Sequence, residues 1–114
     1  MAASQGLARV APALSYQISI RLSAKQDVAE AEDWYEERQS GLGDRFRAEV
    51  FEAVERISDS PLLYPDLFSG NRRCVLRRFP YNIWFRVIGY EVIILAIIHG
   101  KRGPRQLRGR LTRE

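Results

Sequence analysis

The run Val92-Ile93-Ile94-Leu95-Ala96-Ile97-Ile98 decides the fold of this chain. An uninterrupted apolar run, rich in β-branched residues, predicts a strand that is covered on both faces of a sheet. The chain then turns abruptly basic over residues 99–110. A charged segment that leaves the end of a rigid strand is well placed to bind an anion or a partner protein. We therefore expect a mobile basic C-terminal segment over residues 100–114, with a binding site where it begins.

Two further strands precede this run. Residues 81–88 predict a long strand, and Gly89-Tyr90 between the two runs suits a two-residue type II′ hairpin turn. Residues 74–77 predict a shorter strand, which a bend at Arg78-Phe79-Pro80 joins to residues 81–88. The second half of the chain is therefore expected to form three consecutive strands.

The first half predicts one strand and then two helices. Residues 16–22 carry apolar side chains at every second position, which is the period of a half-buried strand. Ser23 opens a capping box for the first helix, and Gly41-Leu42-Gly43 ends it. The second helix is expected to begin with Asp44 as its cap and to end near Ser58.

The two helices are expected to form an antiparallel hairpin, closed by a loop between Pro61 and Pro65. The apolar side chains of Leu62, Leu63 and Tyr64 should tuck under the edge of the sheet. The predicted fold class is α+β, in the order β-α-α-β-β-β. Its sheet is mostly antiparallel, with the helical hairpin packed on one face.

Composition limits the classes of protein to which the chain can belong. A length of 114 residues with 46% hydrophobic residues allows one core, so we expect a single domain over residues 16–114 behind a flexible tail at residues 1–15. The one cysteine, Cys74, excludes an internal disulfide and fits a reducing compartment. No Cys and His cluster has the spacing of a metal site, and no run is long enough to span a membrane. We expect a cytoplasmic protein without metal, cofactor or membrane partner.

The net charge of +4 is unevenly distributed along the chain. Residues 1–59 hold seven basic and eleven acidic residues, whereas residues 60–114 hold eleven basic and three acidic ones. This asymmetry predicts attraction to an acidic partner or to nucleic acid. The acids of the first helix are spread around its exposed side, as in a solvated face, and we assign them no metal site. They are Asp27, Glu30, Glu32, Asp33, Glu36 and Glu37.

Four segments stand out by their order and spacing: residues 29–36, 43–46, 77–81 and 96–104. Together they resemble the RelE/ParE superfamily of toxins from type II toxin–antitoxin systems, over about residues 16–110. The phenylalanine-proline-tyrosine turn and the histidine-glycine-lysine-arginine exit point to the ParE side. The resemblance implies a toxin that arrests growth when free and that is neutralised by an acidic antitoxin, usually encoded beside it.

The superfamily contains two mechanisms. RelE-like members cut messenger RNA on the ribosome. Their main catalytic residues are two lysines on the strand before the turn, one arginine after the turn tyrosine, another arginine beyond the last strand, and a tyrosine near the C terminus. ParE-like members bind and inhibit DNA gyrase. Only Arg102 clearly matches the RelE set, because residues 74–76 replace the lysines, Asn82 follows Tyr81, and no tyrosine follows Arg102. Some superfamily nucleases use a histidine near the end of the last strand, so His99 remains a candidate base beside Arg102.

The basic residues and the turn tyrosine are candidates for contact with a partner or target. Arginine binds carboxylates and phosphates through two parallel hydrogen bonds. We expect some of these side chains to face solvent, with Arg77 and Arg102 as first choices. The set comprises Arg77, Arg78, Tyr81, Lys101, Arg102, Arg105 and Arg108, with Arg110 further along the segment.

Alternation along residues 81–85 places Tyr81 and Phe85 on one face of the sheet and Trp84 on the other. Phe85 should pack in the core. The opposite face should expose an aromatic side chain beside arginines, forming a groove for an antitoxin helix or a stacked base.

Three functional hypotheses follow. The leading one is a ParE-like toxin that inhibits gyrase by binding and has no catalytic residue. The alternative is a RelE-like, ribosome-dependent endoribonuclease that uses His99 and Arg102. The third is a non-toxic member that only binds its antitoxin. In each case operator DNA would be contacted only through the antitoxin complex.

Overall fold

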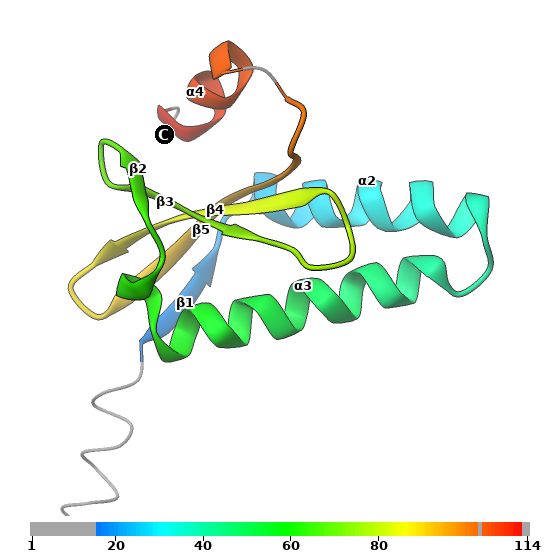
Figure 1. Ribbon diagram of the computed structural model, residues 1–114, viewed down its shortest axis with the longest axis horizontal. Helices are drawn as coiled ribbons and strands as arrows, with labels where there is room; N and C mark the ends of the chain where they lie inside the picture. The colour runs from blue at the N-terminus through cyan, green and yellow to red at the C-terminus, as the bar shows by residue number, and fades with distance from the viewer. Residues whose placement is uncertain (1–15, 103, 113–114) are drawn as a thin grey trace, which may run out of the picture.

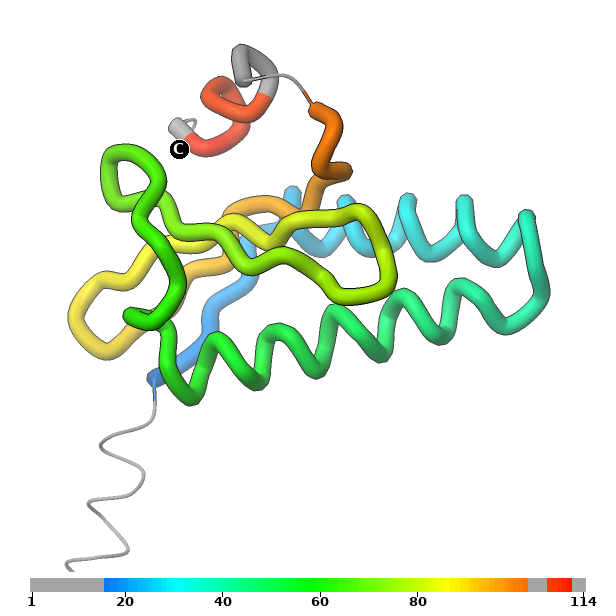
Figure 2. The backbone as a smooth tube through the Cα atoms, in the orientation of Figure 1, coloured from blue at the N-terminus to red at the C-terminus, as the bar shows by residue number. Residues whose placement is uncertain are grey.

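The computed structural model describes residues 16–102 and 104–112, without the side chains of residues 104–106 and 112. The predicted tail at residues 1–15 lies outside the described residues. Figures 1 and 2 show the path of the chain. Its elements are β1 (Gln17–Ile20), α2 (Leu22–Arg38), α3 (Leu42–Asp59), the 3-10 helix η1 (Pro61–Leu63), β2 (Asp66–Phe68), β3 (Asn71–Val75), β4 (Tyr81–Ile88), β5 (Glu91–His99) and α4 (Pro104–Thr112).

The strands form one five-stranded sheet in the order β1-β5-β4-β3-β2. β1 pairs with β5 in parallel, and the other three pairs are antiparallel. α2 and α3 run antiparallel to one another beside this sheet (Figure 1). The predicted α+β fold with its helical hairpin is confirmed. The three-residue edge strand β2 was not predicted, because Asp66-Leu67-Phe68 is too short to show a period.

The long β4–β5 hairpin forms the centre of the sheet. Gly89 has a φ angle of +60°, the sign that a type II′ turn requires at its first central position. The pairing shifts between Trp84, opposite Ala96, and Phe85, opposite Ile94. Leu95 is the extra residue of this bulge, and it packs beside Trp84 on the face away from α2 and α3.

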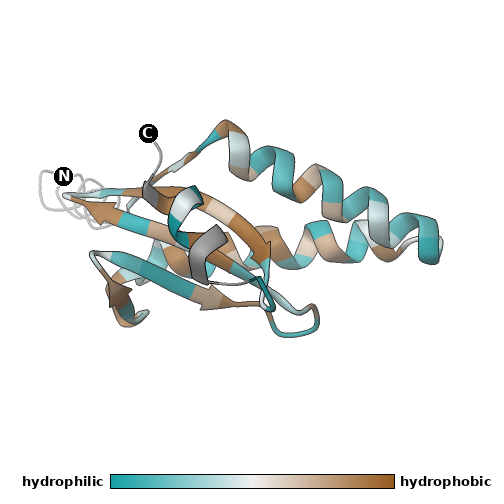
Figure 3. Ribbon diagram, turned by 90° about the horizontal axis from the view of Figure 1, so that it is seen from above, coloured by the Kyte–Doolittle hydropathy of each residue, from teal (hydrophilic) through white to brown (hydrophobic). Residues whose placement is uncertain are grey.

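The sheet is covered on both faces. The main core lies between the helical hairpin and the sheet, and the predicted core residue Phe85 is fully buried there. A second cluster on the opposite face contains Trp84, Leu95 and Ile98, and Leu111 of α4 packs against it. Figure 3 shows the apolar strands in brown with α4 lying over them. The apolar run of β5 is buried on both faces, as its composition predicted.

The predicted helix caps are wrong. α2 begins at Leu22, and its N-cap, Arg21, makes no side-chain capping bond, so Ser23 does not open a capping box. α3 begins at Leu42, and Gly41 is its N-cap with φ +88°. Asp44 therefore lies in the first turn, where its negative charge interacts favourably with the positive end of the helix dipole.

Glu36 of α2 supplies the cap of α3 in place of Asp44. Its carboxylate accepts hydrogen bonds from the backbone N–H groups of Gly41, at 2.9 Å, and Gly43, at 3.0 Å. A Cβ atom at Gly43 would lie 2.7 Å from the carbonyl oxygen of Glu32, so the two helices approach too closely for a side chain there. A contact between α2 and α3 thus fixes the hairpin turn.

The loop after α3 is also packed differently from the prediction. Leu62 and Leu63 are 58% and 83% exposed, so they do not tuck under the sheet. The single 3-10 turn sends successive side chains in different directions. Pro61 is buried and Tyr64 packs against the core, with its ring centroid 5.8 Å from that of Phe85.

The predicted mobile C-terminal segment instead contains the helix α4. Leu107 and Leu111 are four residues apart, so they lie on one side of this helix, and both pack against the outer cluster of the sheet. Among the described residues, no helix is long and apolar enough to cross a membrane.

Candidate partner-binding surface

Several candidate residues meet at one end of the sheet, where the β3–β4 bend lies against the exit from β5. Tyr81 pairs with His99 in the β-ladder. The backbone N–H of Gly100 donates a hydrogen bond of 2.8 Å to the carbonyl of Pro80. These backbone contacts bring Tyr81, His99 and the exposed residues Lys101 and Arg102 into one region.

His99 is engaged by its neighbours. Its Nδ1 accepts a hydrogen bond of 3.1 Å from the backbone N–H of Lys101, and its carbonyl accepts one of 3.0 Å from Arg102. Its ring lies edge-on to Tyr81, with 5.3 Å between the centroids. His99 thus holds the exit turn in place, and its Nδ1 lone pair is already used.

Burial raises the pKa of Tyr81, and the charges of Asp27 and Glu30 raise it further, whereas the charge of Arg102 lowers it. The phenol therefore stays protonated at neutral pH and can donate a hydrogen bond to a partner. Arg102 lies close enough to Tyr81 for its charge to act on the hydroxyl group.

The bend itself is held by a buried acid on α3. Arg77 and Arg78 lie beyond the end of β3, not on it, and both side chains are exposed. The backbone N–H of Arg78 donates a 2.8 Å hydrogen bond to Oε2 of Glu49, and the N–H of Arg77 donates to the same oxygen. Glu49 is 8% exposed. Sequence reasoning missed Glu49, although its place on the apolar stripe between Phe46 and Ala53 is a usable signal.

A pocket of about 570 Å³ lies between α3 and this bend. Arg77 and Arg78 line it from the bend, and Arg45, Glu52 and Arg56 line it from α3. On the other flank of α3, a groove of about 960 Å³ is lined largely by apolar side chains from β1, α2 and α3. These include Ile20, Val28 and Phe51, and Phe51 is 65% exposed. Sequence reasoning did not find this groove.

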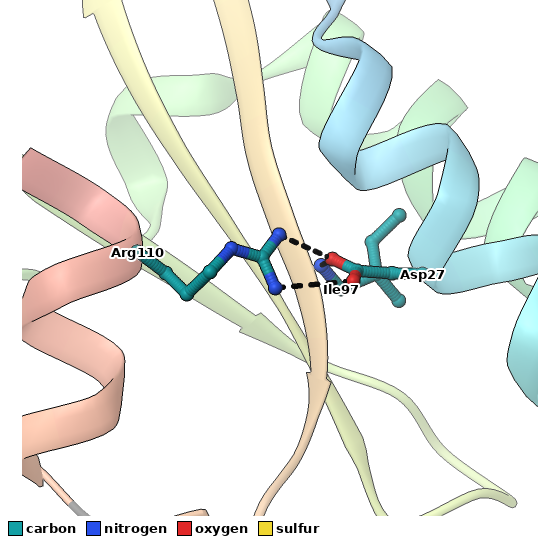
Figure 4. Close-up of polar contacts among 3 residues, drawn as sticks. All are labelled: Asp27, Ile97 and Arg110. Atoms are coloured by element: carbon teal, nitrogen blue, oxygen red, sulfur yellow. Dashed lines mark hydrogen bonds and ion pairs between the residues drawn. The ribbon is translucent and has the colours of Figure 1, made fainter. Parts of the chain in front are cut away.

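The remaining candidates lie on α4. Arg110 is not available for a partner, because its guanidinium donates two hydrogen bonds, of 2.8 and 3.1 Å, to the carboxylate of Asp27 on α2 (Figure 4). Asp27 also accepts a 2.9 Å hydrogen bond from the backbone N–H of Ile97, which lies beyond the end of β1 along β5. Asp27 is therefore an exception to the predicted solvated face.

The other two candidates on α4 are Arg108 and Arg105. The exposed Arg108 lies 5.9 Å from the ring of Phe68, and the side chain of Arg105 lies outside the described residues.

Asp27→Asn tests this link between α2, β5 and α4. The amide keeps one oxygen for the N–H of Ile97 but loses the ion pair, which is largely shielded from solvent. We expect a loss of about 1–2 kcal/mol in the free energy of unfolding, measured in urea. Glu30→Gln, at an exposed position one turn away, is the control and should change stability by less than about 0.5 kcal/mol. Equal stability of the two variants would contradict a structural role for the pair.

The predicted exposed aromatic groove on the outer face is absent from the described surface. Trp84 is 4% exposed, because Leu107 and Leu111 of α4 pack over it. Arg73 does lie beside this tryptophan, 5.9 Å from its ring. Within residues 16–102 and 104–112, no group of three or more His, Cys, Asp or Glu side chains could hold a metal ion.

Comparison with known proteins agrees with this architecture. The structure is similar to a chain of the chromosomal ParDE toxin–antitoxin system from P. aeruginosa, with a TM-score of 0.63 and 24% identity over 75% of this chain and 97% of that one. It is also similar to a chain of the toxin–antitoxin complex RelBE2 from Mycobacterium tuberculosis, with a TM-score of 0.52 and 20% identity over 75% and 98% of the two chains.

Sequence comparison is more specific. No protein with a curated function matches the chain significantly. Residues 18–104 match the family described as the ParE toxin of the type II toxin–antitoxin system parDE. The matched segment runs from β1 through the helical hairpin and the β3–β4 bend to the start of α4. The chain therefore belongs to the ParE toxin family of type II toxin–antitoxin systems.

Proposed function

We propose that this ParE-family chain arrests growth by binding and inhibiting DNA gyrase in the cytoplasm, without catalysing a bond change, and that a cognate antitoxin neutralises it. The observation that carries the non-catalytic mechanism is the state of His99. A general base needs a free lone pair within reach of the substrate hydroxyl. Nδ1 of His99 instead accepts the N–H of Lys101, and its ring packs on Tyr81.

The outer face of the sheet also supports a binding mechanism. A cleft for an RNA base would need an exposed aromatic or arginine platform. On this face Trp84 is covered by α4, so it does not offer such a platform. The exposed cations at this end of the sheet are Arg77, Arg78, Lys101 and Arg102 among the described side chains. Exposed cations on a rigid support suit contact with a protein surface.

The antitoxin has a suitable site in the groove between β1, α2 and α3. Its apolar lining and the exposed ring of Phe51 would accept the apolar side of an amphipathic segment. β1 lies beside this groove and is an edge strand of the sheet, which can pair with an added strand. The solved relatives come from toxin–antitoxin systems, which supports an antitoxin as the occupant.

The decisive experiment is a titration of gyrase supercoiling with the purified chain, with a parallel assay for trapped cleaved DNA. We expect inhibition that the cognate antitoxin reverses. Reversing the charge of Arg77 and Arg102 together should weaken inhibition or antitoxin binding at least about tenfold, because each like-charge contact costs binding free energy. Arg38→Glu, at the C-terminal end of α2, is the control. Full supercoiling with a folded chain that still arrests growth would reject the gyrase target.

The endoribonuclease remains an alternative because His99 and Arg102 share one turn, joined by a backbone hydrogen bond. In that case His99→Ala should abolish cleavage of ribosome-bound messages. Growth arrest by the His99→Ala chain, with gyrase still inhibited, would reject the ribonuclease. A chain that binds antitoxin but affects neither target would support the non-toxic hypothesis.

A further inference from the structure

The pocket between α3 and the β3–β4 bend gathers an unusual number of cations. Four arginines line it: Arg45, Arg56, Arg77 and Arg78. In the described part of the chain, none of them forms a salt bridge. Arg45, Arg77 and Arg78 are exposed, whereas the guanidinium of Arg56 interacts with the side chains of Tyr64 and Cys74. Three guanidinium groups are thus free to bind an external anion.

The acids of this pocket compensate its cations only in part. Glu49 is buried, and the backbone N–H groups of Arg77 and Arg78 occupy its Oε2. Glu52 is the other acid of the lining, and it is exposed. The lining therefore carries four positive and two negative groups.

The support of the pocket is rigid. Glu49 fixes the bend to α3, and Phe79 between the arginines and the core is 9% exposed, with its ring centroid 5.2 Å from that of Phe46. Side chains held on a fixed backbone lose less conformational entropy when they bind. Arginines spaced along such a bend match carboxylates spaced along an extended peptide.

We infer that this pocket binds carboxylate side chains of an acidic segment of the antitoxin, an inference that rests on the proposed neutralisation. Charge complementarity is one argument, since the chain carries +4 overall. Continuity is the second, because Ala48 lines both this pocket and the apolar groove, so a segment lying in the groove reaches the pocket by crossing α3. The arginines line the pocket from both α3 and the bend, so carboxylates spaced along a segment can each reach a separate arginine, whereas a polyphosphate concentrates its charge at one point.

The test uses the full chain and a fluorescent hexaglutamate peptide, with binding followed by anisotropy at low and at physiological ionic strength. Arg45→Gln and Arg78→Gln should each weaken binding about fivefold, since each removes a charge-assisted pair. Arg38→Gln carries the same charge change, but Arg38 stacks on Trp34 and does not line the pocket. Its affinity should stay within twofold of the unmodified chain.

Three results would overturn the inference. One is an equal loss of affinity in Arg38→Gln, which would mean attraction to net charge alone. Another is competition by inorganic pyrophosphate at lower concentration than glutamate peptide, which would mean a phosphate site. The third is failure of the cognate antitoxin to displace the bound peptide. Because gyrase is absent from this assay, a failed gyrase titration together with displaceable peptide binding would reject the target and leave the pocket assignment intact.

Discussion

A chain truncated after Gly103 is expected to lose at least about 4 kcal/mol of folding free energy, because α4 is a packed part of the structure. The truncation removes Leu107 and Leu111 from the outer cluster and uncovers Trp84. Leu111 is buried, and a buried leucine contributes about 2–5 kcal/mol relative to alanine. The partly buried Leu107 adds to this loss, and the partner of Asp27 is removed as well. Since the free energy of unfolding of a single domain is only about 5–15 kcal/mol, the truncation would remove a large part of it.

Urea unfolding and tryptophan fluorescence measure this effect. Trp34 is 48% exposed, so Trp34→Phe leaves the buried Trp84 as the only reporter. Truncation in this background should shift the emission to longer wavelength and lower the urea midpoint. A chain that ends at Thr112 keeps α4 and is the control. A truncated chain with unchanged emission and midpoint would show that α4 does not cover the sheet.

The result matters for toxicity experiments. A truncation that abolishes gyrase inhibition would not by itself identify α4 as a contact, because the fold is weakened at the same time. Arg108→Gln is a better probe, because it removes one exposed charge and keeps the buried packing of Leu111. Arg108 lies beside the ring of Phe68, so the variant should lose some stability, but far less than the truncated chain.

Local patterns were sufficient to predict the centre of the fold. The apolar run of β5, the β4 strand and the Gly89 turn are defined by neighbouring residues, and all three are confirmed. α4 was missed because its charged composition suggested a solvated segment. Its helix is stabilised by docking on the outer face of the sheet, which depends on residues far away in the sequence.

The candidate site shows the same division. Sequence patterns named Tyr81, His99 and Arg102 as separate candidates, and the structure brings them together at one end of the sheet. The two acids that organise the surroundings were missed, since their partners are distant in the chain. Asp27 binds a backbone group 70 residues away, and Glu49 binds one 28 residues away. The periodic pattern of a helix indicates which face of the helix carries such an acid. It does not indicate which distant part of the chain packs against that face.

Glu49→Ala is expected to destabilise the chain by about 3 kcal/mol. The substitution leaves the backbone N–H groups of Arg77 and Arg78 without their acceptor in a part-buried position. Each lost partner costs about 1–3 kcal/mol, and the smaller side chain also leaves a cavity. The urea midpoint measures the loss. Glu52→Ala, three residues along α3 at an exposed position, should change stability by less than about 0.5 kcal/mol.

Glu49→Gln distinguishes the effect of Glu49 on stability from its effect on peptide binding. The amide oxygen can still accept both backbone hydrogen bonds, so its stability should lie between those of Glu49→Ala and the unmodified chain. Removing the negative charge also makes the arginine pocket more positive, so hexaglutamate should bind at least as tightly, although the bend is held less firmly. If Glu49→Gln instead lost peptide binding while retaining its stability, the carboxylate would be positioning the arginines and not only holding the backbone. Equal stability of Glu49→Ala and Glu52→Ala would contradict both roles, because the bend would then be held by the strands alone.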